Sequence, residues 1–182
     1  MRTFVNEFGL EMKFIPCQPV AEDDARVSGY ASLFDVADQN GDIVAPGAFQ
    51  ASLDRHRKEG RSVKFLWHHD PISPIGVWDE LVEDAKGLKA RGRLVTEVSR
   101  AAEAAALLQA GAIDGLSIGY RTVRAEKAGA GRRLIEIDLW EVSIVTFPML
   151  PAARASLKAP DPDEDLADAL SEALQGARAA LA

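Results

Sequence analysis

The chain has little cysteine and no long apolar segment. Cys17 is the only cysteine among 182 residues, which excludes an intrachain disulfide framework and a cysteine-rich zinc motif. No apolar run approaches the roughly 20 residues that would span a bilayer. Glu7, Glu11 and Lys13 interrupt the apolar stretch that an N-terminal signal peptide needs. We therefore expect a soluble protein without an export signal or a membrane partner.

Basic residues are also in the minority, with 21 Lys and Arg against 28 Asp and Glu and a formal net charge of −7. General nucleic-acid binding needs clustered Lys and Arg that release counterions from phosphates, so the charge argues against a nucleic-acid partner. The hydrophobic share of 47% and the charged share of 27% are those of an ordinary globular domain. A chain of this length can bury one sizeable core.

The residue pattern predicts mainly strands. Runs of β-branched and aromatic residues bounded by turn residues predict strands within 10–20, 27–34, 63–69, 75–94 (two strands), 113–125 and 133–147. Helical spacing predicts one helix from about Pro46 to Lys58, ended by Gly60, and a second capped by Thr96, reaching about Ala110 and ended by Gly111. We expect a mainly β domain with flanking helices.

The end of the chain differs in composition from the rest. The acidic, proline-containing APDPDED predicts a linker over 156–165 after a domain that covers 1–155. Leucines on one face then predict an amphipathic helix over 166–182. Such a short helix has little stability alone, so it docks on the domain or binds a partner.

The segment GLSIGY places Ser117 between two glycines. It matches the G-x-S-x-G turn of α/β-hydrolases, but that fold needs its base histidine after the serine. The three histidines, His56, His68 and His69, all precede Ser117. The order of these residues therefore argues against an α/β-hydrolase.

Gly115 and Gly119 lie on the same strand face as Ser117, because strand side chains alternate. Glycines there leave room for a substrate backbone to approach the serine closely, and we predict that both bind substrate. A plain strand that carries one small polar residue is the alternative interpretation.

A serine hydroxyl needs a neighbouring base to become a nucleophile, and His68 and His69 are the candidates. The prolines of the following DPISPIG forbid a regular ladder, so the strand over 63–69 is expected to end at these histidines. Adjacent residues of an extended segment face opposite ways, so only one of the two can point at Ser117. We expect His56, on a charged helix, to be an ordinary surface residue.

The sequence His68-His69-Asp70 also suggests a metal site. Adjacent histidines chelate one ion poorly, and the chain lacks the H-E-x-x-H spacing that places two ligands on one helix face. We predict no metal and no cofactor.

Glu141 lies on the mostly apolar face of the strand LIEIDLWEVSIVTF, together with Ile137, Leu139 and Ser143. A buried carboxylate is costly unless it is paired, so Glu141 should contact an arginine or a histidine. The pattern leaves these two partners open.

Five blocks in order, GYASLFDVADQNGDIVAPGAF, VKFLWHHDPISPIG, a GL-containing hairpin, GAIDGLSIGY and LWEVSIVTFPMLPAA, resemble the prohead proteases of tailed phages. The resemblance covers about Val27 to Ala153. It implies the fold of the herpesvirus capsid-maturation protease, which is a closed, mostly antiparallel β-barrel with surrounding helices. It also implies a serine nucleophile whose base, a histidine, comes before the serine in the chain.

The resemblance implies three catalytic residues in this chain. The histidine directly before an Asp or Asn maps onto His69 as the base, and the serine maps onto Ser117 as the nucleophile. The E-V-S block maps onto Glu141 as the residue that orients His69, with Asp70 as the competitor for that role. Backbone amides would receive the oxyanion of the tetrahedral intermediate.

The implied substrates are the scaffolding segment of the major capsid protein and the protease itself, cut inside the assembling procapsid in the cytoplasm of the bacterial host. Self-association is a possible further contact. Two other interpretations stay open. One is a catalytically silent capsid-assembly component with the same fold, and the other is an unrelated metal-dependent hydrolase that uses His68, His69 and Asp70.

Overall fold

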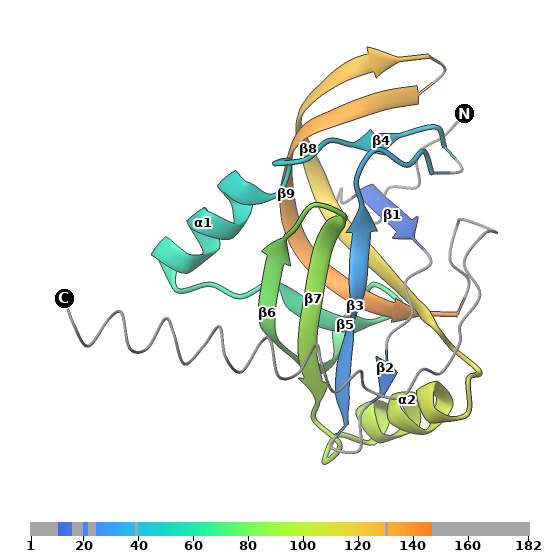
Figure 1. Cartoon of the computed structure of the whole chain (residues 1–182). Coiled ribbons are helices and arrows are strands. Elements are labelled where there is room, and N and C mark those ends of the chain that lie inside the picture. Colours follow the sequence, from blue (N-terminus) through green and yellow to red (C-terminus); the bar gives the residue numbers. More distant parts are fainter. Residues whose placement is uncertain (1–10, 16–19, 22–24, 39, 130, 147–182) are drawn as a thin grey trace.

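A curved, mostly antiparallel β-sheet forms the body of the protein, with two helices beside it in the described part of the chain (Figure 1). The computed structural model describes residues 11–15, 20–21, 25–38, 40–129 and 131–146. The predicted linker over 156–165, the predicted helix over 166–182 and the end of the predicted domain 1–155 lie outside these residues.

The strands are β1 (Glu11–Ile15), β2 (Val20–Ala21), β3 (Arg26–Leu33), β4 (Ile43–Val44), β5 (Lys64–Trp67), β6 (Asp70–Glu83), β7 (Gly87–Leu94), β8 (Gly115–Ala128) and β9 (Gly131–Val145). The helices are α1 (Gln50–Glu59) and α2 (Ser99–Gln109). Each predicted strand segment is present. The sequence did not predict β2 and β4 as strands of their own, because two residues are too few to leave a pattern. Strand β6 begins at Asp70 instead of the predicted Ile75, and its pairing with β5 in the proline-containing segment has register shifts.

The strands follow the order β1-β8-β9-β5-β6-β7-β3-β2, and β4 pairs with β9 outside this path. The pairs of β9 with β4 and with β5 are parallel, and the others are antiparallel. No ladder among the described strands joins β1 to β2 at the two ends of the path. The sheet is therefore a curled half-barrel that stays open. The expectation of a mainly β, mostly antiparallel fold with few helices is confirmed, whereas the closed barrel is not.

The β8–β9 hairpin is the longest element and projects at the top of the view in Figure 1. Both strands continue into the predicted turn AEKAGAG, and the chain reverses beside Gly129, which has a φ of 58°. At two register shifts between β8 and β9, a residue of β9 has no Cα partner on β8; these residues are Trp140 and Ile135. Such bulges bend a strand and change which residues face inward, so Leu134 is buried while Ile135 is only half-buried.

Helix α1 begins at Gln50 instead of the predicted Pro46, because residues 46–49 form turns. The backbone N–H of Phe49 donates to Oε1 of Glu83 at 2.8 Å. Glu83 lies at the end of β6, 34 residues away along the chain, and its carboxylate accepts a hydrogen bond from a backbone N–H at the start of α1. The helix ends at Gly60, as predicted, with a left-handed φ of 62°.

Helix α2 begins at Ser99, and the predicted cap at Thr96 is wrong. Val98 occupies the N-cap position and no side chain caps the helix. Thr96 instead lies in a turn that the N–H of Val98 closes by donating to the carbonyl of Val95 at 2.9 Å. The helix ends before Gly111, which has a φ of 67°, as the sequence predicts.

One apolar cluster joins both helices to the sheet. Its members include Phe49 and Leu53 at α1, Ala101, Ala104 and Leu108 of α2, and Phe65, Ile75, Leu88, Leu116, Ile118, Leu134, Ile137, Leu139, Val142 and Ile144 of the strands. Burial of each large side chain contributes about 1.5–3 kcal/mol. The strands β5, β8 and β9, which carry the candidate site, thus belong to the rigid centre of the protein.

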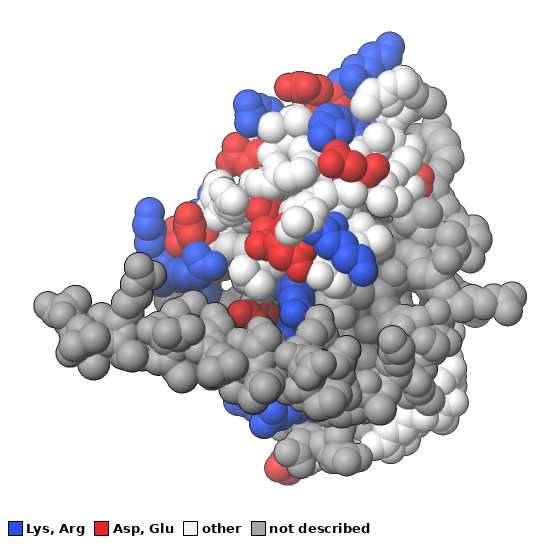
Figure 2. All heavy atoms as spheres, in the orientation of Figure 1, with Lys and Arg blue, Asp and Glu red and all other residues white. Residues whose placement is uncertain are grey.

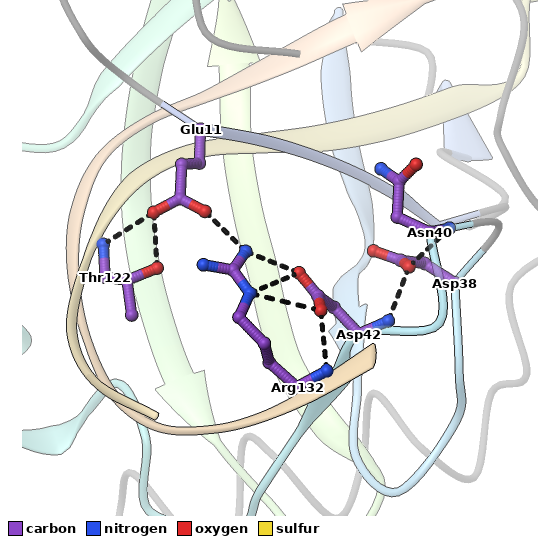
Figure 3. Close-up of polar contacts among 6 residues, drawn as sticks. All are labelled: Glu11, Asp38, Asn40, Asp42, Thr122 and Arg132. Atoms are coloured by element: carbon purple, nitrogen blue, oxygen red, sulfur yellow. Dashed lines mark hydrogen bonds and ion pairs between the residues drawn. The ribbon is translucent and has the colours of Figure 1, made fainter. Parts of the chain in front are cut away.

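A polar cluster fixes β1 and the loop before β4 to the hairpin (Figure 3). The guanidinium of Arg132, at the start of β9, binds both oxygens of the buried Asp42 and also Oε2 of Glu11 at 2.6 Å. The other oxygen of Glu11 accepts from the backbone and the hydroxyl of Thr122. Bidentate charged pairs are among the stronger hydrogen bonds, so this cluster holds β1 against β8.

Charges of both signs are mixed over the described part of the face in Figure 2. Two ion pairs join β6 to β7, in which Arg91 pairs with Glu80 at 3.8 Å and Arg93 pairs with Asp79. Neither α1 nor α2 is long and apolar enough to cross a membrane.

Candidate active site

The two adjacent histidines form the turn between β5 and β6. Trp67 at the end of β5 pairs with Asp70 at the start of β6, so His68 and His69 are the two loop residues. Their φ angles are 50° and 61°. Two positive φ angles are typical of the type I′ hairpin turn, which Asn and Gly usually occupy. The strand ends at the histidines, as predicted, but the predicted extended segment is wrong, so strand alternation does not separate the two side chains.

The strained turn is fixed to β9. Left-handed backbone costs a residue other than glycine roughly 1–3 kcal/mol and persists only where its surroundings enforce it. The N–H of His68 donates to the carbonyl of Ile144 at 3.0 Å, and the N–H of His69 donates to Oγ of Ser143 at 3.0 Å. Two consecutive residues of β9 thus hold both backbone amides of the turn.

The imidazole of His69 contacts Glu141 inside the protein. Nδ1 lies 2.5 Å from Oε1 of Glu141, and the two side chains are 7% and 5% exposed. A carboxylate only accepts, so Nδ1 carries the proton and the lone pair of the neutral ring is on Nε2. The histidine alternative for the partner of Glu141 is therefore correct, and the arginine alternative is wrong.

The carboxylate of Glu141 fills the space above Gly119. A Cβ atom at Gly119 would lie 2.0 Å from Oε1 of Glu141, so only glycine leaves room for the carboxylate there. This role of Gly119 was not foreseen from the sequence. Contact of Gly115 and Gly119 with a substrate stays a prediction.

Ser117 lies on β8 directly opposite Ser143 of β9, and Gly119 lies opposite Glu141. Residues that oppose each other in an antiparallel pair point to the same face. Ser117, Glu141 and Ser143 therefore share one face of the sheet, and the N–H of His69 reaches the same face through Ser143. Ser143 thus contacts the predicted base and the predicted acid, and it is the Cα partner of the predicted nucleophile. Ser117 is fully buried.

His68 and Asp70 have other contacts. Nε2 of His68 lies 3.2 Å from Oγ1 of Thr146. Burial lowers the pKa of His68, and so does electrostatic repulsion from the neighbouring His69 ring when both are protonated. The Asp70 carboxylate accepts from the N–H of Ile72 at 3.1 Å and from a serine hydroxyl within its own turn. In the part of the chain that the structure describes, no three His, Cys, Asp or Glu side chains gather in a group that could hold a metal.

His56 is not the plain surface residue that the sequence suggests. Its Nε2 lies 2.8 Å from the carbonyl oxygen of Leu139, and the N–H of Leu139 donates to Oγ of Ser52 at 2.9 Å. Both side chains come from α1 and bind the backbone of β9 beside the Trp140 bulge. Helix α1 therefore supports the strand two residues before Glu141.

Three comparisons with known proteins show what the chain is similar to. A family model described as caudovirus prohead serine protease matches residues 16–165. The prohead protease of Enterobacteria phage HK97 is 37% identical over 145 residues, which cover 77% of this chain and 63% of that protein. The bacteriophage T4 capsid assembly protease has a TM-score of 0.61 at 16% sequence identity, over 76% of this chain and 98% of that chain.

The likeness to the T4 protein shows a shared fold. The chain spans less than two thirds of the length of the HK97 protein. The family match covers the turn at His69, the Ser117 strand and the Glu141 strand in one stretch.

Proposed function

The chain belongs to the caudovirus prohead serine proteases, and from that premise we propose that it is a serine endopeptidase that cleaves the major capsid protein as the procapsid matures. The observation that carries the proposal is the buried contact between His69 and Glu141, 2.5 Å long, on the sheet face that also carries Ser117. A base, its acid partner and a hydroxyl in one place are what acyl transfer from a peptide requires.

In the first half of the reaction the Ser117 hydroxyl attacks the carbonyl carbon of the scissile peptide. Nε2 of His69 takes the hydroxyl proton, which it can do because Nδ1 already holds a proton and donates it to Glu141. The charge of Glu141 stabilises the imidazolium that forms. The C–N bond then breaks, His69 gives the proton to the leaving amine, and an acyl group stays on Ser117.

In the second half a water molecule takes the place of the amine. His69 accepts a proton from the water, and the resulting hydroxide attacks the acyl carbon. The proton returns to Oγ as the ester bond breaks, so serine and histidine recover their starting states. Burial of the His69–Glu141 pair strengthens their interaction, because the local dielectric constant is low.

The names of the two relatives, prohead protease and capsid assembly protease, support a capsid substrate. We propose the scaffolding segment of the major capsid protein as the region that is cut, and the protease itself as a second substrate. Both cuts would take place inside the assembling procapsid in the host cytoplasm. Copies of the chain would associate there, where their local concentration is high.

Co-expression of the chain with a major capsid protein that carries its scaffolding segment tests the proposal. Mass spectrometry should find a shortened capsid protein with one defined new terminus, and a serine-reactive fluorophosphonate should prevent the cut. An intact capsid protein that still assembles with the chain would instead identify a catalytically silent assembly component. Loss of cleavage with a chelator, and not with the fluorophosphonate, would point to a metal-dependent hydrolase.

A further inference from the structure

We infer that Ser143 is the positioning residue of the His69–Glu141 pair, which it holds in place without contacting the substrate. The inference rests on the proposed function and extends it to a fourth residue of the same site. Ser143 is fully buried on β9, two residues after Glu141.

The hydroxyl of Ser143 makes two contacts of opposite kind. It donates to Oε2 of Glu141 at 2.6 Å and accepts from the backbone N–H of His69 at 3.0 Å. A serine hydroxyl has one proton to donate and two lone pairs that accept, so one Oγ serves both partners. The base and its acid partner are therefore tied to the same atom.

The contact with Glu141 orients the carboxylate. A glutamate side chain has several rotatable bonds, and its two oxygens exchange by rotation of the last one. Because Ser143 holds Oε2 and Gly119 leaves room beside Oε1, Oε1 is directed at Nδ1 of His69. A carboxylate so fixed keeps the proton of the neutral imidazole on Nδ1 and the lone pair on Nε2.

The contact with His69 fixes the backbone of the turn. His69 has a φ of 61°, which a residue other than glycine adopts only where contacts enforce it. Its N–H has the Ser143 hydroxyl as acceptor, while the neighbouring N–H of His68 has the carbonyl of Ile144. A residue at position 143 without a hydroxyl would leave the half-buried N–H of His69 without this acceptor.

The place of Ser143 in the sheet puts it next to the strands of the nucleophile and of the base. It is the Cα partner of Ser117 on β8 and of Leu66 on β5. Strand β9 lies between the strand of the nucleophile and the strand that leads into the turn of the base. Ser143 thus sets the position of His69 relative to Ser117 as well as to Glu141.

Ser143→Ala tests the inference, with Ser32→Ala as the matched control. Ser32 is a fully buried strand serine whose Oγ has no hydrogen-bond partner among the described residues. With a capsid-derived peptide as substrate, Ser143→Ala should lower kcat roughly 10- to 100-fold and change KM little, because it displaces catalytic groups and not the substrate. Ser32→Ala should keep the wild-type kcat. Should the alanine variant not fold, Ser143→Cys has nearly the same volume and only weak hydrogen-bonding capacity, and the same loss is expected.

A spectroscopic measurement separates positioning from a general structural role. In the Ser117→Ala background, the Nδ1–H proton of His69 should give a downfield NMR resonance, since it donates to a carboxylate at short distance. Ser143→Ala should move or broaden this resonance, and Ser32→Ala should leave it in place. This readout does not need cleavage, so it decides the role of Ser143 even if the chain is not a protease. An unchanged kcat, or a lowered kcat with an unchanged resonance, would overturn the inference.

Discussion

His69 and Glu141, 72 residues apart in the chain, meet through Nδ1 and Oε1 at 2.5 Å with both side chains almost completely buried. The meeting depends on two local features. The turn at His68-His69 has left-handed backbone, and Gly119 has no side chain where the carboxylate lies. Each feature gives a prediction that a variant can test.

Glu141→Gln should keep the shape of the site and remove its charge. The amide no longer stabilises an imidazolium, and its NH₂ group can favour the wrong tautomer of His69, so kcat should fall roughly 10³- to 10⁴-fold. Steady-state cleavage of a capsid-derived peptide measures this loss. Glu136→Gln, on the same strand, serves as the control and should keep full activity. Full activity of Glu141→Gln would remove Glu141 from the mechanism.

The two histidines should respond differently to substitution. His69→Ala removes the base, and cleavage should fall to background. His68→Asn should retain most activity, because Asn tolerates left-handed backbone and His68 contacts Thr146 instead of Glu141. The rates of peptide cleavage by the two purified variants check this. Equal losses in both would contradict the assignment of His69 as the base.

Gly119→Ala should disable the site by displacing Glu141. Its Cβ would lie 2.0 Å from Oε1, so the carboxylate or the strand must move, at a cost of about 1–3 kcal/mol in the free energy of unfolding. We expect kcat to fall at least about 10²-fold, which corresponds to a misplacement of about 1 Å.

Gly129→Ala is the control for this substitution. Its Cβ would meet nothing within 4 Å, although its φ of 58° makes alanine unfavourable by about 1–2 kcal/mol. It should therefore lose stability and keep its activity. Urea denaturation and peptide cleavage of both variants separate the two effects, and wild-type kcat in Gly119→Ala would refute the displacement.

The pKa of His68 predicts part of the dependence of stability on pH. Burial, followed by repulsion from His69 when both rings are protonated, lowers this pKa in the folded protein, so on acidification the unfolded chain takes up the proton first. The free energy of unfolding should therefore fall as the pH drops below the unfolded value of about 6.5. His68→Asn lacks this contribution, so its loss of stability between pH 8 and pH 5.5 should be smaller than that of the wild type. Urea denaturation at both pH values measures the difference, and identical losses would contradict it.

Part of this site was foreseen from the sequence, because residue type and order along the chain select Ser117 and an upstream histidine as candidates. The choice of His69 and Glu141 came from the resemblance to the prohead proteases, and the three catalytic roles stay predictions. The sequence also predicts that Glu141 needs a partner, since burial of an unpaired carboxylate is costly.

The remaining features depend on contacts between distant segments, which local patterns do not contain. The start of α1 follows from a contact between Phe49 and Glu83, 34 residues away. The roles of Gly119 and Ser143 follow from the register of β8 against β9. The left-handed turn between β5 and β6 is formed by His68 and His69, whereas Asn and Gly are the usual residues of such a turn. Closure of the barrel was expected from resemblance alone, and the ladder between β1 and β2 that it needs is absent among the described strands.

Cleavage of co-expressed capsid protein by Ser117→Ala, compared with the wild type and with Ser32→Ala, tests the central claim most directly. Ser117 and Ser32 are both fully buried strand serines. The two variants therefore make the same chemical change in the same kind of environment, and only Ser117→Ala makes it in the candidate active site. We predict that Ser117→Ala keeps the far-ultraviolet circular dichroism and melting temperature of the wild type and leaves the capsid protein uncut, while Ser32→Ala cuts it normally. Processing by Ser117→Ala at the wild-type rate would contradict the account.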